Sequence, residues 1–262
     1  MVTDIFITTG QRPNNDVVDM AESLAKEWKI PFVRREKESI EQMFLKAPAI
    51  LVCTKEGPVL HTPAGAHSFH LNLAYLRIKN LKKGNHDHMI TAMNLRSGLR
   101  LLDCTLGLAT DAIVASFALG AVGQVVGLES EKALAAVTTY GLKHFTADEQ
   151  DVTQALRQIT VQAASYETFL KSQPDNSFDV VYFDPMFRHP VTKSSQFKPL
   201  RTLANPSPLS IEALAEAKRV AKERVVLKET RGSREFSRLG FTDFVGGRYS
   251  RIQYGLWQKA VT

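Results

Sequence analysis

The sequence predicts an α/β protein in which a small α/β lobe precedes a doubly wound parallel sheet. From about residue 95 onward, short apolar runs alternate with helical stretches, which is the pattern of parallel strands joined by helices. The first of these runs ends in an acidic residue and a tight turn before a helix. Two last apolar runs, at 241–245 and 252–257, flank GGRYS and indicate a closing antiparallel hairpin. We therefore expect one domain over residues 1–94, including a basic connector, and a second over residues 95–262.

Composition narrows the class of protein. With 262 residues, of which 44% are hydrophobic, the chain can bury a sizeable core. Its two cysteines, Cys53 and Cys104, lie in apolar runs, which argues against a disulfide framework and for a reducing compartment. No leader and no apolar stretch of roughly 20 residues is seen, so we expect a soluble cytoplasmic protein without a membrane partner. The net charge of +6 favours an anionic partner such as RNA, although many basic proteins bind no nucleic acid.

The first lobe has local signals of structure but no catalytic signature. Residues 4–8 are typical of a strand, and residues 17–28 have an apolar helical face. Ser39 with Gln42 resembles a capping box that opens a short helix. Residues 49–54 and 58–62 flank a turn and predict a hairpin.

Residues 69–93 are basic and contain three histidines. Two interpretations stay open: a surface that faces RNA phosphate or the cofactor's edge, or a solvated connector between lobes. We expect no metal site, since His86 and His88 lie on opposite sides of either a strand or a helix and no cysteine pair accompanies them. The residues assigned to RNA in this segment are Arg77, Lys79, Lys82 and Lys83.

The stretch LRLLDCTLGLATD, at 99–111, predicts a buried strand, a turn and a helix start. Asp103 ends the strand, Thr105 is small, and Gly107 would let a ligand approach the backbone. The helix that opens near Asp111 would supply free amide donors. These features are typical of a nucleotide-type cofactor loop. A plain strand, turn and helix is the alternative, because the loop lacks the full run of glycines of a pyrophosphate-binding turn.

The next two predicted strands also end in polar residues. Residues 124–129 end in Glu129, where an acid can hold both ribose hydroxyls of a cofactor. Residues 159–163 are followed by Ser165, which could contact an adenine or simply cap the helix that follows. Between these strands we expect helices at 131–140, with Gly141 as terminator, and at 148–158.

FDVVYFDPMF, at 178–187, is the most informative motif. After a buried strand, Asp184, Pro185 and Phe187 could form a slot for a planar group that bears an amine, with oxygens accepting its N–H bonds and the ring stacking on its face. Alternatively, a turn ends the strand and Phe187 returns to the core. The basic stretch 190–208 that follows is typical of a lid or substrate guide, or of disorder.

The end of the chain completes the predicted sheet. Residues 211–220 favour a helix, and a fifth parallel strand is expected from residue 224. Five parallel strands with a closing antiparallel hairpin distinguish this sheet from an ordinary dinucleotide-binding sheet.

With these motifs in order, the chain resembles the class I S-adenosylmethionine-dependent methyltransferases. More narrowly, it resembles the ribosomal RNA small-subunit methyltransferase J family, which methylates a guanine exocyclic amine. The resemblance spans residues 99–228 and rests on VVYFDPMF and on DCTLGLATD, close to the family's DxTxGLGxD with Ala109 for a glycine. It implies a Rossmann-like seven-stranded sheet and the following cofactor-binding residues: Thr110, Asp111, Glu129, Ser130, Ala164, Ser165 and Asp184.

The sequence departs from this family at three places. Ser130 stands where a basic residue is usual, Ala164 replaces a serine, and Arg188 replaces the proline after DPMF. The first lobe matches the family poorly, so the RNA target stays open.

The mechanism implied by the resemblance and the motif is methyl transfer to an exocyclic amine, with guanine of ribosomal RNA as the expected acceptor. Asp184 and the Pro185 carbonyl would orient the amine, Phe187 would stack the base, and Arg188 would help to bind the substrate. Methylation of another RNA, of DNA or of a protein amide is the alternative. A silent RNA-binding or ribosome-assembly factor is a rival of a different class, and a nicotinamide oxidoreductase is a weaker one.

Overall fold

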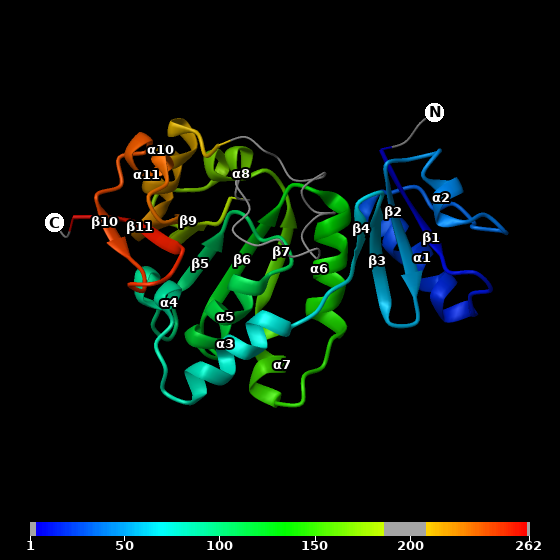
Figure 1. Cartoon of the computed structure of the whole chain (residues 1–262), viewed down its shortest axis with the longest axis horizontal. Coiled ribbons are helices and arrows are strands. Elements are labelled where there is room, and N and C mark those ends of the chain that lie inside the picture. Colours follow the sequence, from blue (N-terminus) through cyan, green and yellow to red (C-terminus); the bar gives the residue numbers. More distant parts are fainter. Residues whose placement is uncertain (1–3, 186–207, 261–262) are drawn as a thin grey trace. The chain divides into compact units, whose positions relative to one another are not determined.

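The computed structural model describes residues 4–185 and 208–260 and has two compact units, each with its own sheet (Figure 1). The first unit comprises residues up to His70 together with 131–144, and the second begins at Leu71. This boundary differs from the expected one at residue 94. The basic connector forms two helices that pack in the second unit, α3 (Asn72–Lys82) and α4 (His88–Met93).

The first unit has a four-stranded sheet in the order β1-β2-β3-β4. Its strands are β1 (Ile5–Thr9), β2 (Ala49–Thr54), β3 (Gly57–Thr62) and β4 (Gly65–His67). The predicted hairpin joins β2 to β3, and the predicted capping box of Ser39 and Gln42 opens α2 (Ile40–Met43). Helix α1 (Asn15–Trp28) packs on β1 and β2, and α6 (Lys132–His144) packs on β3.

The prediction that Gly141 ends a helix is wrong. Gly141 lies inside α6, where a Cβ would come within 1.9 Å of a ring atom of Phe69. A glycine is therefore required for close packing and not for termination. This long-range contact could not be read from local sequence.

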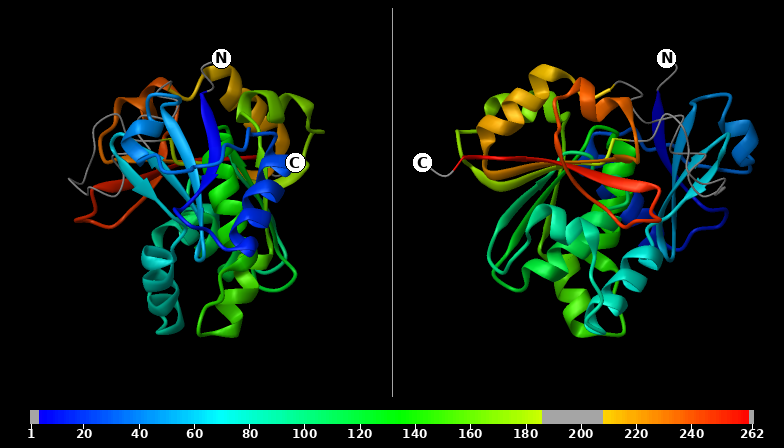
Figure 2. Two further views of the ribbon diagram at one scale, coloured as in Figure 1. Left: turned by 90° about the vertical axis from the view of Figure 1, so that its right-hand side faces the viewer. Right: turned by 60° about the vertical axis from the view of Figure 1, so that its left-hand side comes forward.

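The second unit has a seven-stranded sheet in the order β10-β11-β9-β8-β5-β6-β7. Five strands are parallel: β5 (Arg100–Asp103), β6 (Gln124–Glu129), β7 (Ile159–Ala163), β8 (Phe178–Phe183) and β9 (Ala221–Thr230). The hairpin of β10 (Asp243–Val245) and β11 (Ile252–Gln258), orange and red in Figure 2, pairs antiparallel with β9 through β11. The predicted α/β class with a seven-stranded sheet is confirmed.

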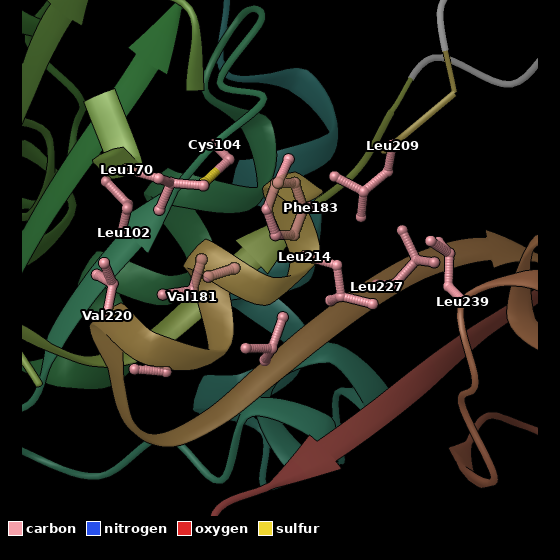
Figure 3. Close-up of a cluster of buried hydrophobic side chains, with 14 of the residues drawn as sticks. Leu102, Cys104, Leu170, Val181, Phe183, Leu209, Leu214, Val220, Leu227 and Leu239 are labelled. Atoms are coloured by element: carbon pink, nitrogen blue, oxygen red, sulfur yellow. The ribbon is translucent and has the colours of Figure 1, made fainter. Parts of the chain in front are cut away.

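Helices cover both faces of this sheet. Helices α5 (Thr110–Leu119) and α7 (Gln150–Arg157) pack together with α3. On the other side, α8 (Tyr166–Ser172), α10 (Ile211–Val220) and α11 (Arg234–Arg238) contribute to one buried apolar cluster. Figure 3 shows its members from strands and helices, including Leu102, Val181, Phe183 and Leu214. Burial of these side chains fixes the strand ends that carry the polar residues.

Candidate active site

The sheet has a topological switch point between β5 and β8. From β5 the chain goes to β6 and β7 on one side, then returns to β8 and β9 on the other. In open α/β sheets, ligands bind in the crevice at the carboxyl ends of the strands beside such a point. Asp103 ends β5 and Asp184 follows β8, so two of the predicted site residues lie on either side of it.

Backbone and side-chain hydrogen bonds hold the two strand ends together. The Asp184 N–H donates to Thr105 Oγ1 at 2.6 Å, and the Thr105 N–H donates to Asp103 Oδ1 at 3.0 Å. Asp103 is only 2% exposed, and this burial raises its pKa to about 8. The small polar side chain of Thr105 thus connects the predicted cofactor loop to the predicted amine slot.

The loop leaves room beside its glycine. Gly107 has a φ of +53°, and a Cβ built there meets nothing within 4 Å. Its N–H donates to Glu129 Oε2 at 3.1 Å, which brings the ends of β5 and β6 together. Helix α5 begins after Ala109, which is in the left-handed region and gives no side-chain cap. An open backbone and a helix start without a side-chain cap offer N–H donors to the acceptor groups of a cofactor. The Glu129 carboxylate can accept from its hydroxyl groups.

Asp111 is the centre of a buried ion network. Its Oδ1 accepts from Arg77, while Oδ2 accepts from the Tyr182 hydroxyl at 2.7 Å and from Lys228 Nζ at 2.8 Å. Burial alone would raise the pKa of Asp111, but Lys228 and Arg77 hold it well below its usual range. The carboxylate predicted to bind cofactor is therefore engaged by three groups of the protein.

Lys228 joins this network to Asp184. Its Nζ lies 2.7 Å from Asp184 Oδ2, and its side chain is 17% exposed. Burial alone would lower the lysine pKa, but Asp111 and Asp184 hold it well above its usual value. Burial is the largest cause that raises the pKa of Asp184, to about 6, against the opposing effect of Lys228.

Sequence reasoning missed Lys228 and Tyr182. A single lysine near the end of the apolar strand RVVLKE was the signal that could have drawn attention to it. The strand order was needed to see which carboxylates it faces.

Arg77 was predicted to contact RNA phosphate, but the structure uses its guanidinium within the protein. Its Nε donates to Asp87 Oδ2 at 2.8 Å, and it also pairs with Asp111. The three lysines predicted with it are exposed, and Lys82 pairs with Asp151 at 2.8 Å. Whether these lysines bind RNA stays a prediction.

The remaining predicted residues are distributed along the same strand ends. Ser165 caps α8, accepting from the Thr168 N–H at 3.3 Å, so the capping interpretation is confirmed while contact with a cofactor stays a prediction. Phe187 and Arg188 and the proposed lid up to residue 207 lie outside the described residues. The others lie at the start of a helix or just after a strand: Thr110 opens α5, Ser130 follows β6, Ala164 follows β7 and Pro185 follows Asp184.

Residues 4–185 and 208–260, which the structure describes, lack two kinds of feature. Within them, no cluster of three or more histidine, cysteine or acidic side chains could hold a metal ion. Nor does any helix in these ranges have the length and apolar character needed to cross a membrane.

The chain is similar to known methyltransferases in both sequence and fold. A family model described as "Putative SAM-dependent methyltransferase" matches residues 26–241. The chain is 40% identical over 257 residues to "Uncharacterized protein YpiP" of Bacillus subtilis, covering 97% of this chain and 100% of that protein. It is 30% identical over 186 residues to Ribosomal RNA small subunit methyltransferase J of Buchnera aphidicola, covering 67% and 71% of the two chains.

A crystal structure of a SAM-dependent methyltransferase from Neisseria gonorrhoeae has a similar fold. Its TM-score is 0.69 at 16% identity, with 96% of this chain and 95% of that chain covered. At this identity the likeness concerns the fold alone. The family match spans most of the chain, including the switch point and its strand ends, so S-adenosylmethionine is the cofactor and the chain belongs to the family of S-adenosylmethionine-dependent methyltransferases.

Proposed function

We propose that the chain methylates the exocyclic N2 amine of a guanine in small-subunit ribosomal RNA. The observation that carries this proposal is the position of Asp184 and Pro185 at the switch point, with the carboxylate held by Lys228 and the backbone held by Thr105. The relatives named Ribosomal RNA small subunit methyltransferase J support the choice of substrate, as does the net charge of +6.

The cofactor would lie across the ends of β5, β6 and β7. We assign the Gly107 backbone and the first amides of α5 to its polar groups and Glu129 to its ribose hydroxyls, with Asp103 at the adjacent end of β5. Thr105, Ser130, Ala164 and Ser165 would line the same crevice. When bound, S-adenosylmethionine supplies a methyl group activated on a sulfonium.

The chain's own task is to orient a poor nucleophile. The lone pair of a guanine amine is delocalised into the ring. Asp184 and the Pro185 carbonyl would accept its two N–H bonds and so turn the lone pair toward the methyl group. As the new N–C bond forms and the S–C bond breaks, the amine gives up one proton. Asp184, whose pKa is about 6, is placed to receive it and pass it to water.

The test is to incubate the protein with labelled S-adenosylmethionine and, separately, small ribosomal subunits, naked small-subunit RNA, DNA and protein. Digestion of the RNA and mass spectrometry should identify N2-methylguanosine. A folded Asp184→Ala variant should lose most of its turnover even at saturating cofactor. Label in another nucleoside, in DNA or in protein would make the proposed acceptor wrong, and binding of RNA without any methylation would favour a silent binding factor.

A further inference from the structure

The loop between β10 and β11, residues 246–251, lies at the same edge of the sheet as Asp184. Strand β11 is antiparallel to β9, with Ile252 paired to Thr230 and Tyr254 paired to Lys228. The chain therefore enters β11 where β9 ends, just beyond the lysine that binds Asp184. Arg231 and Arg234 follow β9 at this edge, and we call them, together with 246–251, the arginine loop.

Hydrogen bonds from Arg231 and packing against α4 fix the conformation of the arginine loop. Arg231 donates from Nε to the Ser250 carbonyl at 3.0 Å and from its terminal nitrogen to the Gly247 carbonyl at 2.6 Å. The Ser250 N–H closes a turn on the same Gly247 carbonyl at 3.0 Å. A Cβ at Gly247 would lie 2.8 Å from His88 Nε2, so α4 packs directly against the turn. A loop fixed in this way needs little ordering when it binds a partner.

The outer side of this loop presents an aromatic ring and positive charge. Tyr249 is 89% exposed, and the Arg248 guanidinium lies 5.5 Å from the centre of its ring. Arg234 and Arg251 are exposed as well, and neither 230–234 nor 246–251 contains an acidic residue. An exposed aromatic ring beside arginines is the combination on which single-stranded nucleic acids stack their bases and rest their phosphates.

The lysines of α3 are less well placed for a substrate of this site. Lys82 lies 5.5 Å from the ring of Phe117, which is near the end of α5. Because α5 starts at the carboxyl ends of the strands and runs toward their amino ends, Lys82 lies on the side away from Asp184. The arginine loop, by contrast, continues the edge that carries the site.

We propose that the arginine loop binds single-stranded RNA next to the nucleotide to be methylated, with one base stacked on Tyr249 and phosphates on Arg248 and Arg234. This inference rests on the proposed function, since it takes RNA as the substrate. Arg231 has a positioning role, because its guanidinium is occupied by the loop carbonyls.

The test uses the full chain and a fluorescent single-stranded RNA of about a dozen nucleotides. Tyr249→Ala should weaken binding by about 5- to 150-fold, the range measured for loss of one stacked base. Tyr249→Phe should keep the affinity, since the ring is retained. Arg248→Ala should reduce the salt dependence by about 0.7 of a unit of slope. The matched control is Lys222→Ala, which removes one charge at the amino end of β9 and should change neither quantity.

Calorimetry with S-adenosylmethionine should give the same affinity for all these variants, which separates the loop from the cofactor site. If Tyr249→Ala and Arg248→Ala both bind RNA like the parent, the inference is wrong although the proposed function survives. If binding depends on the loop but no guanine is methylated, the proposed function fails, and of the inference only the binding of RNA by the loop stands. A parent protein that binds DNA and not RNA, or neither, overturns the inference.

Discussion

Helix α3 carries basic residues in two different settings: Arg77 forms buried ion pairs, and Lys82 forms an exposed one. Arg77 points into the unit and pairs with Asp87 and Asp111, with 23% of its side chain exposed. Lys82, five positions later, pairs on the surface with Asp151, whose side chain is 53% exposed. Both are basic residues of one cluster in the sequence. Their environments differ in their effect on stability. Removing one partner of a buried ion pair destabilises the fold strongly, because the other charge stays buried and unpaired, whereas removing one partner of an exposed pair costs little.

Breaking the buried pair should have the largest effect on stability. We expect Arg77→Ala to lower the free energy of unfolding by about 3 kcal/mol, because Asp87 and Asp111 are left buried without their common partner. The matched control on the same helix, Lys82→Ala, should cost less than about 1 kcal/mol. Urea denaturation of both variants measures the difference. Equal losses would show that the two settings do not differ as the burial implies.

Glu129 is less exposed than the surface lysines of α3, and its removal should mainly lower the affinity for the cofactor. Its carboxylate is partly exposed and accepts from the Gly107 N–H at 3.1 Å. Glu129→Ala should weaken binding of S-adenosylmethionine by about 10- to 100-fold, as expected for hydrogen bonds to a charged group. Calorimetry measures this, and Glu223→Ala, at the amino end of β9, serves as control. Unchanged affinity in the Glu129 variant would remove that carboxylate from the cofactor site.

The sequence predicts the parts of this site that depend on local pattern and misses those that depend on packing. Apolar runs followed by polar residues locate Asp103, Glu129 and Asp184, because the carboxyl ends of parallel strands share one edge. The pairing of Arg77 with Asp111 depends on how α3 lies on α5, which periodicity does not encode. Lys228 reaches Asp184 only because β9 lies next to β8, a choice made by the strand order.

The pH dependence of turnover should report the ionisation of Asp184 within the buried network. Its pKa is raised to about 6, and the carboxylate is the form that accepts an amine proton. At saturating cofactor, turnover should therefore fall about tenfold per pH unit below 6 and level off above it. The folded protein also holds this proton more tightly than the unfolded chain, so Asp184 contributes stability that is lost as the pH rises from 3.8 to about 6.

Lys228→Met sharpens the same test. Without the positive charge that lowers the carboxyl pKa, the fall in turnover should move to higher pH. Rate profiles of the parent and the variant measure the displacement, and circular dichroism checks that the variant is folded. Profiles that coincide would show that Lys228 has a structural role without influence on Asp184.

The exposed lysines of α3 should give the smallest effect, and one confined to RNA. Lys79, Lys82 and Lys83 lie outside the ion network, and the first two contact Tyr75 and Asp151 at the surface. If they contact phosphate, the triple alanine variant should lose about one unit of salt slope per contacting lysine on duplex RNA, with unchanged cofactor affinity. The position of Lys82 beside the end of α5 leads us to expect a smaller loss than three units. Binding titrations at several salt concentrations measure the slope. A slope equal to that of the parent would leave these lysines as a solvated surface, while a loss of all three units would place RNA along α3, in contrast to the buried role of Arg77.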